Sequence, residues 1–147
     1  LLPQGRFFKA GLEQAQQGTY PLDVVKDYTA NYQKSGGSNS FADYYVASKQ
    51  QVTMNAFLRE RVLFSEHNLV TDGVFGEMQL IMCRNVMIYF DKELQDRVIG
   101  LFKDSLCAGG FLCLGSKESL KFSSHADDFE VVREKERIYR KKRSGRS

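Results

Sequence analysis

The residues best suited to chemistry lie at the end of one apolar stretch, Ile81–Asp91 (IMCRNVMIYFD). Arg84 and Asn85 interrupt this run. A guanidinium offers a fixed fork of donors, and a carboxamide both donates and accepts. The pair is therefore predicted to contact a ligand such as a nucleoside or its charged tail. In the alternative interpretation, Asn85 caps the following turn and Arg84 pairs with Asp91 or Glu93, and the spacing does not separate the two.

A strand–helix–strand pattern surrounds this pair and would position it. MQLIMCRN is an apolar strand, DKELQDRVIGLFKDSLCAGG is an amphipathic helix predicted to end at Gly109 and Gly110, and FLCLGS is a second apolar strand. Near-continuous apolar strands around a helix predict a parallel sheet covered on both faces. Ligands bind beyond the carboxyl ends of such strands, where Arg84 and Asn85 would lie. DFEVVRE and ERIYRKK predict an antiparallel hairpin at the sheet edge.

Further candidate residues fall near the same predicted edge. Tyr89 and Phe90 are expected either to line a pocket or to pack in the core. GSKES, residues 115–119, follows the second strand and could line the crevice. Asn68 and Leu69 would reach this edge if the chain returns to the sheet there, although asparagine is more often a turn residue.

The first half of the chain has a different pattern, in which two helices are followed by short strands. A helix over Gly11–Gln17 stops at Gly18, and a second helix opens at Pro21 and closes at the glycine pair 36–37. FADYYVAS, QQVTMN and ERVLFSEHN predict two or three antiparallel strands, with AFLRE as a helical turn between the last two.

Composition narrows the class of protein. With 147 residues, 42% hydrophobic and 27% charged, the chain fits one soluble globular domain. It has no membrane-length apolar run and no secretory signal pattern, so we expect a cytoplasmic protein without membrane insertion. Three cysteines without C-x-x-C spacing and two distant histidines predict neither a disulfide framework nor a metal site. The basic tail is expected to be a solvated end of the chain. Nucleic-acid binding is not indicated, because the folded part has no stripe of basic residues interleaved with aromatic ones.

The block CRNVMIYFDKELQDRV…FKDSLCAGGFLCLGSKESL resembles the CheR-type chemotaxis-receptor methyltransferases, and GTYPLDVV and HNL fall at matching places. The likeness runs from Gly11 to Lys142. It implies an α/β fold: the C-terminal part of a Rossmann-like class I methyltransferase with an inserted small antiparallel β-subdomain. On this reading residues 1–147 are a partial methyltransferase domain, with an atypical start (1–10), the β-subdomain (41–64) and the C-terminal half of the sheet (78–142).

The resemblance also implies a reaction and a set of contacts. Such enzymes transfer a methyl group from S-adenosylmethionine to glutamate side chains of chemoreceptors (methyl-accepting chemotaxis proteins), leaving S-adenosylhomocysteine. The family pattern places Asn68 and Leu69 against the adenine, Arg84 and Asn85 around the cofactor, and Tyr89 near the transferred methyl as a positioning residue. Because a glutamate is already ionised near neutral pH, the enzyme mainly has to align the two reactants. The absence of a catalytic triad is therefore consistent with this reading.

The sequence also departs from the family. The pattern expects a helical domain, a first strand with a glycine-rich G-E-E loop, and an acidic residue before the KAGLEQA-like helix, where LLPQGRFF stands instead. We therefore expect an open edge at the strand Gln79–Cys83, weak or absent cofactor binding and impaired catalysis. The competing hypothesis is a non-catalytic module that docks a chemoreceptor or regulatory partner through the β-subdomain by strand addition.

Overall fold

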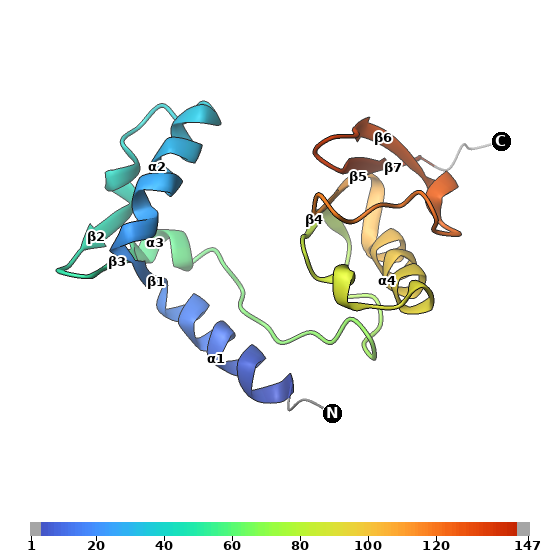
Figure 1. Cartoon of the computed structure of the whole chain (residues 1–147), viewed down its shortest axis with the longest axis horizontal. Coiled ribbons are helices and arrows are strands. Elements are labelled where there is room, and N and C mark those ends of the chain that lie inside the picture. Colours follow the sequence, from blue (N-terminus) through green and yellow to red (C-terminus); the bar gives the residue numbers. More distant parts are fainter. Residues whose placement is uncertain (1–3, 144–147) are drawn as a thin grey trace. The chain divides into compact units, whose positions relative to one another are not determined.

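The computed structural model describes residues 4–143 of the chain. The chain divides into two compact units, the N-terminal unit Leu1–Glu66 and the C-terminal unit His67–Ser147, each with its own sheet (Figure 1). One sheet mixes parallel and antiparallel strands and the other is a small antiparallel sheet. The predicted α/β class with an extra antiparallel sheet is confirmed.

The C-terminal unit is built on the predicted strand–helix–strand pattern. Its four-stranded sheet has the order β4-β5-β7-β6; β4 runs parallel to β5, and the other neighbours are antiparallel. The hairpin at one edge of the sheet is likewise confirmed. The elements are β4 (Met78–Cys83), α4 (Lys92–Ser105), β5 (Leu106–Leu114), β6 (Phe129–Arg133) and β7 (Ile138–Lys141).

Helix α4 ends earlier than the sequence predicted. It stops at Ser105, and Leu106 is already extended, so the glycines 109 and 110 lie inside β5 and do not end the helix. The ammonium of Lys141 donates to the carbonyls of Lys103 and Leu106, at 2.6 Å each. A cation at the C-terminus satisfies carbonyls that have no helical partner, which stabilises the early end. The glycine pair instead occupies an irregular stretch where the β4–β5 register shifts.

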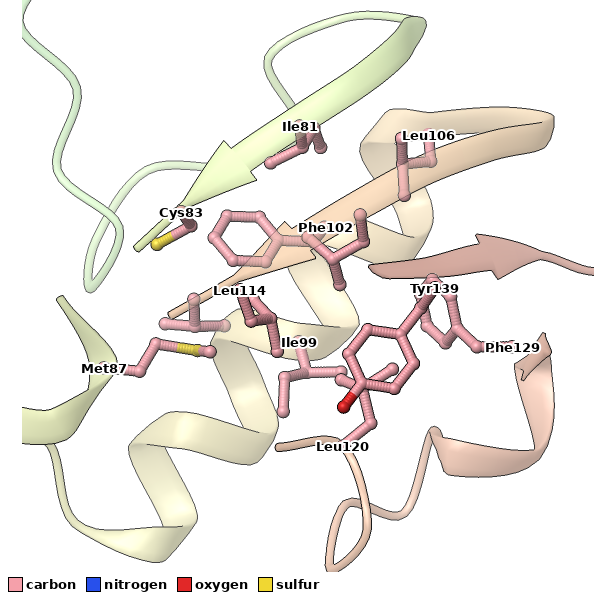
Figure 2. Packing of buried hydrophobic residues seen from close by; sticks show 12 residues of the cluster. Ile81, Cys83, Met87, Ile99, Phe102, Leu106, Leu114, Leu120, Phe129 and Tyr139 are labelled. Atoms are coloured by element: carbon pink, nitrogen blue, oxygen red, sulfur yellow. The ribbon is translucent and has the colours of Figure 1, made fainter. Parts of the chain in front are cut away.

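One face of this sheet packs against α4 and forms the core of the unit. Figure 2 shows side chains from β4, α4, β5 and the β6–β7 hairpin converging there. Leu80, Met82 and Phe111 alternate onto the opposite face and remain exposed. Within the described residues of this unit, the covering of both faces that the apolar strands predicted is therefore not seen. The core consists of Ile81, Cys83, Met87, Val98, Ile99, Phe102, Leu106, Leu112, Leu114, Leu120, Phe129 and Tyr139.

The N-terminal unit combines helices with a three-stranded antiparallel sheet of order β1-β3-β2. The two predicted helices and the helical turn are present, but the first helix begins earlier than Gly11, at Gln4, and the second begins at Val25 and not at Pro21. Pro21 instead ends a strand, Thr19–Pro21, that was not predicted. Short 3-10 helices at Leu22–Val24 and Phe41–Tyr44 precede α2 and β2. The elements are α1 (Gln4–Gln17), β1 (Thr19–Pro21), α2 (Val25–Lys34), β2 (Tyr45–Ala47), β3 (Gln51–Met54) and α3 (Ala56–Arg59).

The third strand of this sheet comes from a different segment than expected. ERVLFSEHN was predicted as a possible strand, but residues 62–68 form neither helix nor strand. The edge of β3 that it would have needed is taken by β1, which pairs through Tyr20 opposite Val52. Of the atypical start at 1–10, residues 1–3 lie outside the described residues and 4–10 begin α1.

Candidate functional site

The carboxyl ends of β4 and β5 lie side by side, as the predicted site requires. Cys83 pairs with Leu114 in the parallel register, so Arg84 and Asn85 follow one strand where Gly115 follows the other. A methyl group added at Gly115 would lie 2.5 Å from Oδ1 of Asn85. This close approach needs glycine. The structure therefore brings Asn85 and the start of GSKES together at one sheet edge.

Asn85 has an unusual backbone conformation for a residue with a side chain. Its φ is 61°, in the left-handed region that asparagine tolerates better than most residues. Val86 follows with φ −108° and ψ −51°, which is right-handed. Successive residues of opposite hand aim their N–H groups into one concavity that binds anions.

The anion in that concavity is the carboxylate of Glu118, which is only 4% exposed. It accepts N–H bonds from Asn85 (3.0 Å), Val86 (2.9 Å), Met87 (2.8 Å) and Gly115 (2.6 Å). The four donors offset the cost of burying a carboxylate. Sequence reasoning named the GSKES stretch but gave Glu118 no role. The available signal was an acid three residues after Gly115, the glycine that follows the second apolar strand.

The same carboxylate affects the neighbouring thiol. Burial, and then the negative charge of Glu118, raise the pKa of Cys83 to about 11. Cys83 is thus a neutral core residue at physiological pH, in line with the predicted buried free thiol.

Arg84 is exposed and does not form the ion pair of the alternative interpretation. Within residues 4–143 its guanidinium makes no salt bridge with Asp91 or Glu93. Asp91 instead caps α4, its carboxylate accepting the N–H of Leu94 at 2.9 Å. Arg84 is therefore available to a ligand on the solvent side of the strand end.

The two aromatic candidates, Tyr89 and Phe90, differ in how exposed their side chains are. Tyr89 ends a 3-10 helix at Met87–Tyr89 and is 82% exposed, whereas Phe90 is half-buried against the core. The core-packing interpretation thus applies to Phe90. The placing of Tyr89 near a transferred methyl stays a prediction.

Asn68 and Leu69 also lie in the C-terminal unit, where Asn68 forms a turn and Leu69 packs against the core. The side-chain oxygen of Asn68 accepts the N–H of Val70 at 2.9 Å, and its own N–H donates to Asp72 at 2.7 Å. This is the turn geometry typical of asparagine. That bond from Asn68, more than the nearby His67, lowers the pKa of Asp72. Leu69 packs against the core. Contacts of this pair with an adenine stay predicted.

The donor set at the strand ends fits one side of an S-adenosylmethionine molecule. The cofactor has a nucleoside and a charged amino-acid tail, and the edge presents an exposed guanidinium and an exposed asparagine over a backbone fixed by Glu118. In the described part of the chain, no three metal-ligating side chains gather, and no helix has the length and apolarity to cross a membrane.

Comparison with known families gives one match over most of the chain. Residues 9–138 match the sequence profile described as "CheR methyltransferase, SAM binding domain". The matched range includes the candidate residues at both strand ends, from Asn68 to Glu118.

Curated relatives bear related names. The putative methyltransferase Cher3 of Pseudomonas putida is 50% identical over 130 residues, which cover 88% of this chain and 48% of that protein. Chemotaxis protein methyltransferase 2 of Pseudomonas aeruginosa is 34% identical, over 78% of this chain and 40% of that protein. A chemotaxis protein methyltransferase of Vibrio parahaemolyticus is 39% identical, over 52% and 27%. The chain thus spans half or less of the length of these relatives.

Proposed function

This chain belongs to the CheR methyltransferase family, and we propose that it supplies one wall of a site that methylates chemoreceptor glutamates with S-adenosylmethionine. The observation that carries the proposal is the meeting of the CRNVMIYFD strand end with Gly115 at the carboxyl edge of the parallel β4–β5 pair. This is where open α/β sheets bind their ligands. Family membership and the names of the relatives support the cofactor and the substrate class.

The residues of this chain would act by binding and alignment. S-adenosylmethionine supplies an activated methyl group. Arg84 and Asn85 would hold the cofactor, with Asn68 and Leu69 against its adenine. Tyr89 would orient the acceptor. A substrate glutamate is ionised at neutral pH, so no base in the chain is needed to deprotonate it.

We expect the 147-residue chain by itself to bind this cofactor more weakly than micromolar. Within the described residues only β5 pairs with β4, and no glycine-rich loop after a sheet strand faces Arg84. A site with donors on one side leaves much of the ligand in water, which lowers the affinity. Calorimetric titration with S-adenosylhomocysteine tests this expectation. Micromolar binding that Arg84→Ala abolishes would show that this chain contains a complete site.

The reaction itself is tested with methyl-labelled S-adenosylmethionine and a chemoreceptor cytoplasmic domain. A glutamate methyl ester releases labelled methanol in base, whereas methylated lysine or arginine does not. Because catalysis by this chain is expected to be impaired, slow formation of base-labile label on the receptor, reduced further by Asn85→Ala, is the expected result. Base-stable label would contradict glutamate as the acceptor.

A non-catalytic docking module is the second candidate, and one observation favours it. Strand β2 lies at the edge of its sheet, with Val46 exposed on it, so its outer side offers backbone groups to an added strand. Chemical-shift mapping with a chemoreceptor C-terminal peptide separates the two functions. Shifts at 45–47 without any response to S-adenosylhomocysteine would favour the module.

A further inference from the structure

The buried carboxylate of Glu118 lies beneath the candidate site, and the proposed chemistry leaves it unused. Its two oxygens divide the four donors. Oε2 accepts from Asn85 and Gly115, and Oε1 accepts from Val86 and Met87. Each oxygen therefore serves two N–H groups, and the carboxylate ties the end of β4 to the end of β5.

This arrangement accounts for the conformation of Asn85. A left-handed residue other than glycine is unfavourable and persists where the surroundings hold it. Three consecutive N–H groups, from Asn85 to Met87, point to one carboxylate. Relaxing Asn85 would turn its N–H away and leave a buried charge with fewer donors, which is costly. Glu118 thus fixes the backbone that presents Arg84 and Asn85.

We propose that Glu118 is a positioning residue for the cofactor, an inference that rests on the proposed function. It does not touch the ligand. It locks the turn after β4 so that Arg84 and Asn85 are preorganised at the carboxyl edge of the sheet. Preorganisation raises affinity because the binding step no longer has to order these groups.

Glu118→Gln is a sharp test because it keeps the shape of the side chain. Its amide nitrogen would replace one oxygen and face two N–H donors, so two of the four bonds are lost whichever way the amide points. Asp127→Asn is the matched control. Asp127 is exposed on the same connection after β5, and its carboxylate accepts no hydrogen bond from any described residue.

The first readout needs no cofactor. Amide hydrogen exchange is expected to speed up about tenfold in Glu118→Gln at the pair of amides that faces the new nitrogen, since one lost bond to a charged group is worth at least this factor. That pair is Asn85 and Gly115 or Val86 and Met87, according to which oxygen is replaced. Exchange in the core of α4 and in Asp127→Asn should stay unchanged. Unchanged protection at all four amides in Glu118→Gln would overturn the inference.

The second readout is binding, followed by chemical shifts during titration with S-adenosylhomocysteine up to millimolar concentration. We expect the wild type to respond at Arg84 and Asn85, and Glu118→Gln to bind about tenfold more weakly. Equal affinities would overturn the positioning role while leaving the proposed function intact. No response in the wild type would defeat the proposed cofactor site in this chain, and the inference with it.

Gly115→Ala gives an independent perturbation if Glu118→Gln does not fold. The added methyl would lie 2.7 Å from Oε2 of Glu118 and 2.8 Å from the nitrogen of Asn85, so it pushes the two apart without changing the charge. The same faster exchange and weaker binding are expected. Wild-type exchange and affinity in this variant would count against the role of the carboxylate.

Discussion

The two units of the chain reach stability by different routes. The C-terminal unit packs one sheet face against α4 around twelve buried core residues. In the N-terminal unit, among residues 10–66, whose burial the structure describes, the buried hydrophobic residues are Val25 and Val52. The N-terminal unit instead has a cluster of partly exposed aromatic rings, in which the centroids of contacting rings lie 5.5–6.5 Å apart. The rings are those of Tyr32, Phe41, Tyr44, Tyr45 and Phe57.

This difference bears on the two candidate functions, because each of them uses a different unit. A rigid core beneath β4 and β5 can hold a turn such as that at Asn85 in a strained conformation. A small sheet with a free edge, in a unit that also carries a cluster of mostly half-buried aromatic side chains, is instead suited to contacts with another polypeptide. The proposed cofactor positioning would therefore fall to the C-terminal unit, and docking, the second candidate function, would fall to the N-terminal unit.

The change with the largest expected effect on this comparison is to truncate Phe102, the largest fully buried side chain of the core. Phe102 is 2% exposed on α4, and Phe102→Ala should destabilise the C-terminal unit by about 3–5 kcal/mol through lost burial and a cavity. Denaturant unfolding with hydrogen exchange resolved by residue measures this loss. Phe122→Ala is the control, because Phe122 is 88% exposed, and its effect should be within about 0.5 kcal/mol. Equal losses would refute the assignment of the core.

The rate of alkylation of Cys83 tests whether the carboxylate of Glu118 lies beside this thiol. Because the pKa of Cys83 is raised to about 11, its thiolate is scarce at pH 8, and alkylation should be roughly a hundredfold slower than for an ordinary thiol. Mass spectrometry of iodoacetamide-treated protein should find the half-buried Cys107 and Cys113 labelled first. Glu118→Gln should speed the labelling of Cys83, as it removes the second cause of the raised pKa. Fast labelling of Cys83 in the wild type would contradict this picture.

The small sheet offers the matching packing test. Val52 is buried at the centre of β3, opposite Tyr20 and Ala47 on its neighbours. Val52→Ala should destabilise the N-terminal unit by about 1–2 kcal/mol, less than Phe102→Ala costs its own unit, because fewer buried atoms are lost. Hydrogen exchange at β1 and β2 measures this. Val46→Ala in the same sheet is the exposed control, and an equal effect there would show that Val52 is not a core residue.

The smallest effect concerns the aromatic surface. Hydrogen bonds from Tyr32 and Asn39 lower the pKa of Tyr44, while the bond to Tyr44 raises the pKa of Tyr32. In Tyr32→Phe the pKa of Tyr44 should rise, because the phenolate loses a donor. An alkaline titration of ¹³C-labelled tyrosines measures this. Tyr28→Phe should leave the pKa of Tyr44 unchanged, and a shift there of the same size would argue against a direct bond.

Local sequence patterns were enough to predict the elements of the C-terminal unit. The predictions that failed concern features that depend on contacts between residues far apart in the sequence. The alternation and helical spacing between Met78 and Lys141 identify β4, α4 and the hairpin, because each depends on neighbours in sequence. The strand at Thr19–Pro21 was missed because three residues ending in proline acquire their strand only from pairing with β3. The end of α4 depended on Lys141, a side chain 38 residues away from the carbonyl of Lys103.

The residues of the candidate site likewise fall into those that the sequence could identify and those that only the structure could identify. Arg84 and Asn85 could be found because two polar residues interrupt an apolar run and match a family signature. Glu118 could not, because its role arises only where the turn after β4 meets the loop after β5. The turn made by Asn68 was the ordinary alternative for that residue, and only the structure shows its bonds to Val70 and Asp72.

Chemical-shift mapping of S-adenosylhomocysteine on the ¹⁵N-labelled chain tests the central claim most directly. The account predicts shifts that grow up to millimolar ligand and gather at Arg84, Asn85 and residues 115–117, and no comparable change at 19–59. Shifts concentrated in the N-terminal unit, or none anywhere at millimolar ligand, would contradict a cofactor wall at the carboxyl ends of β4 and β5.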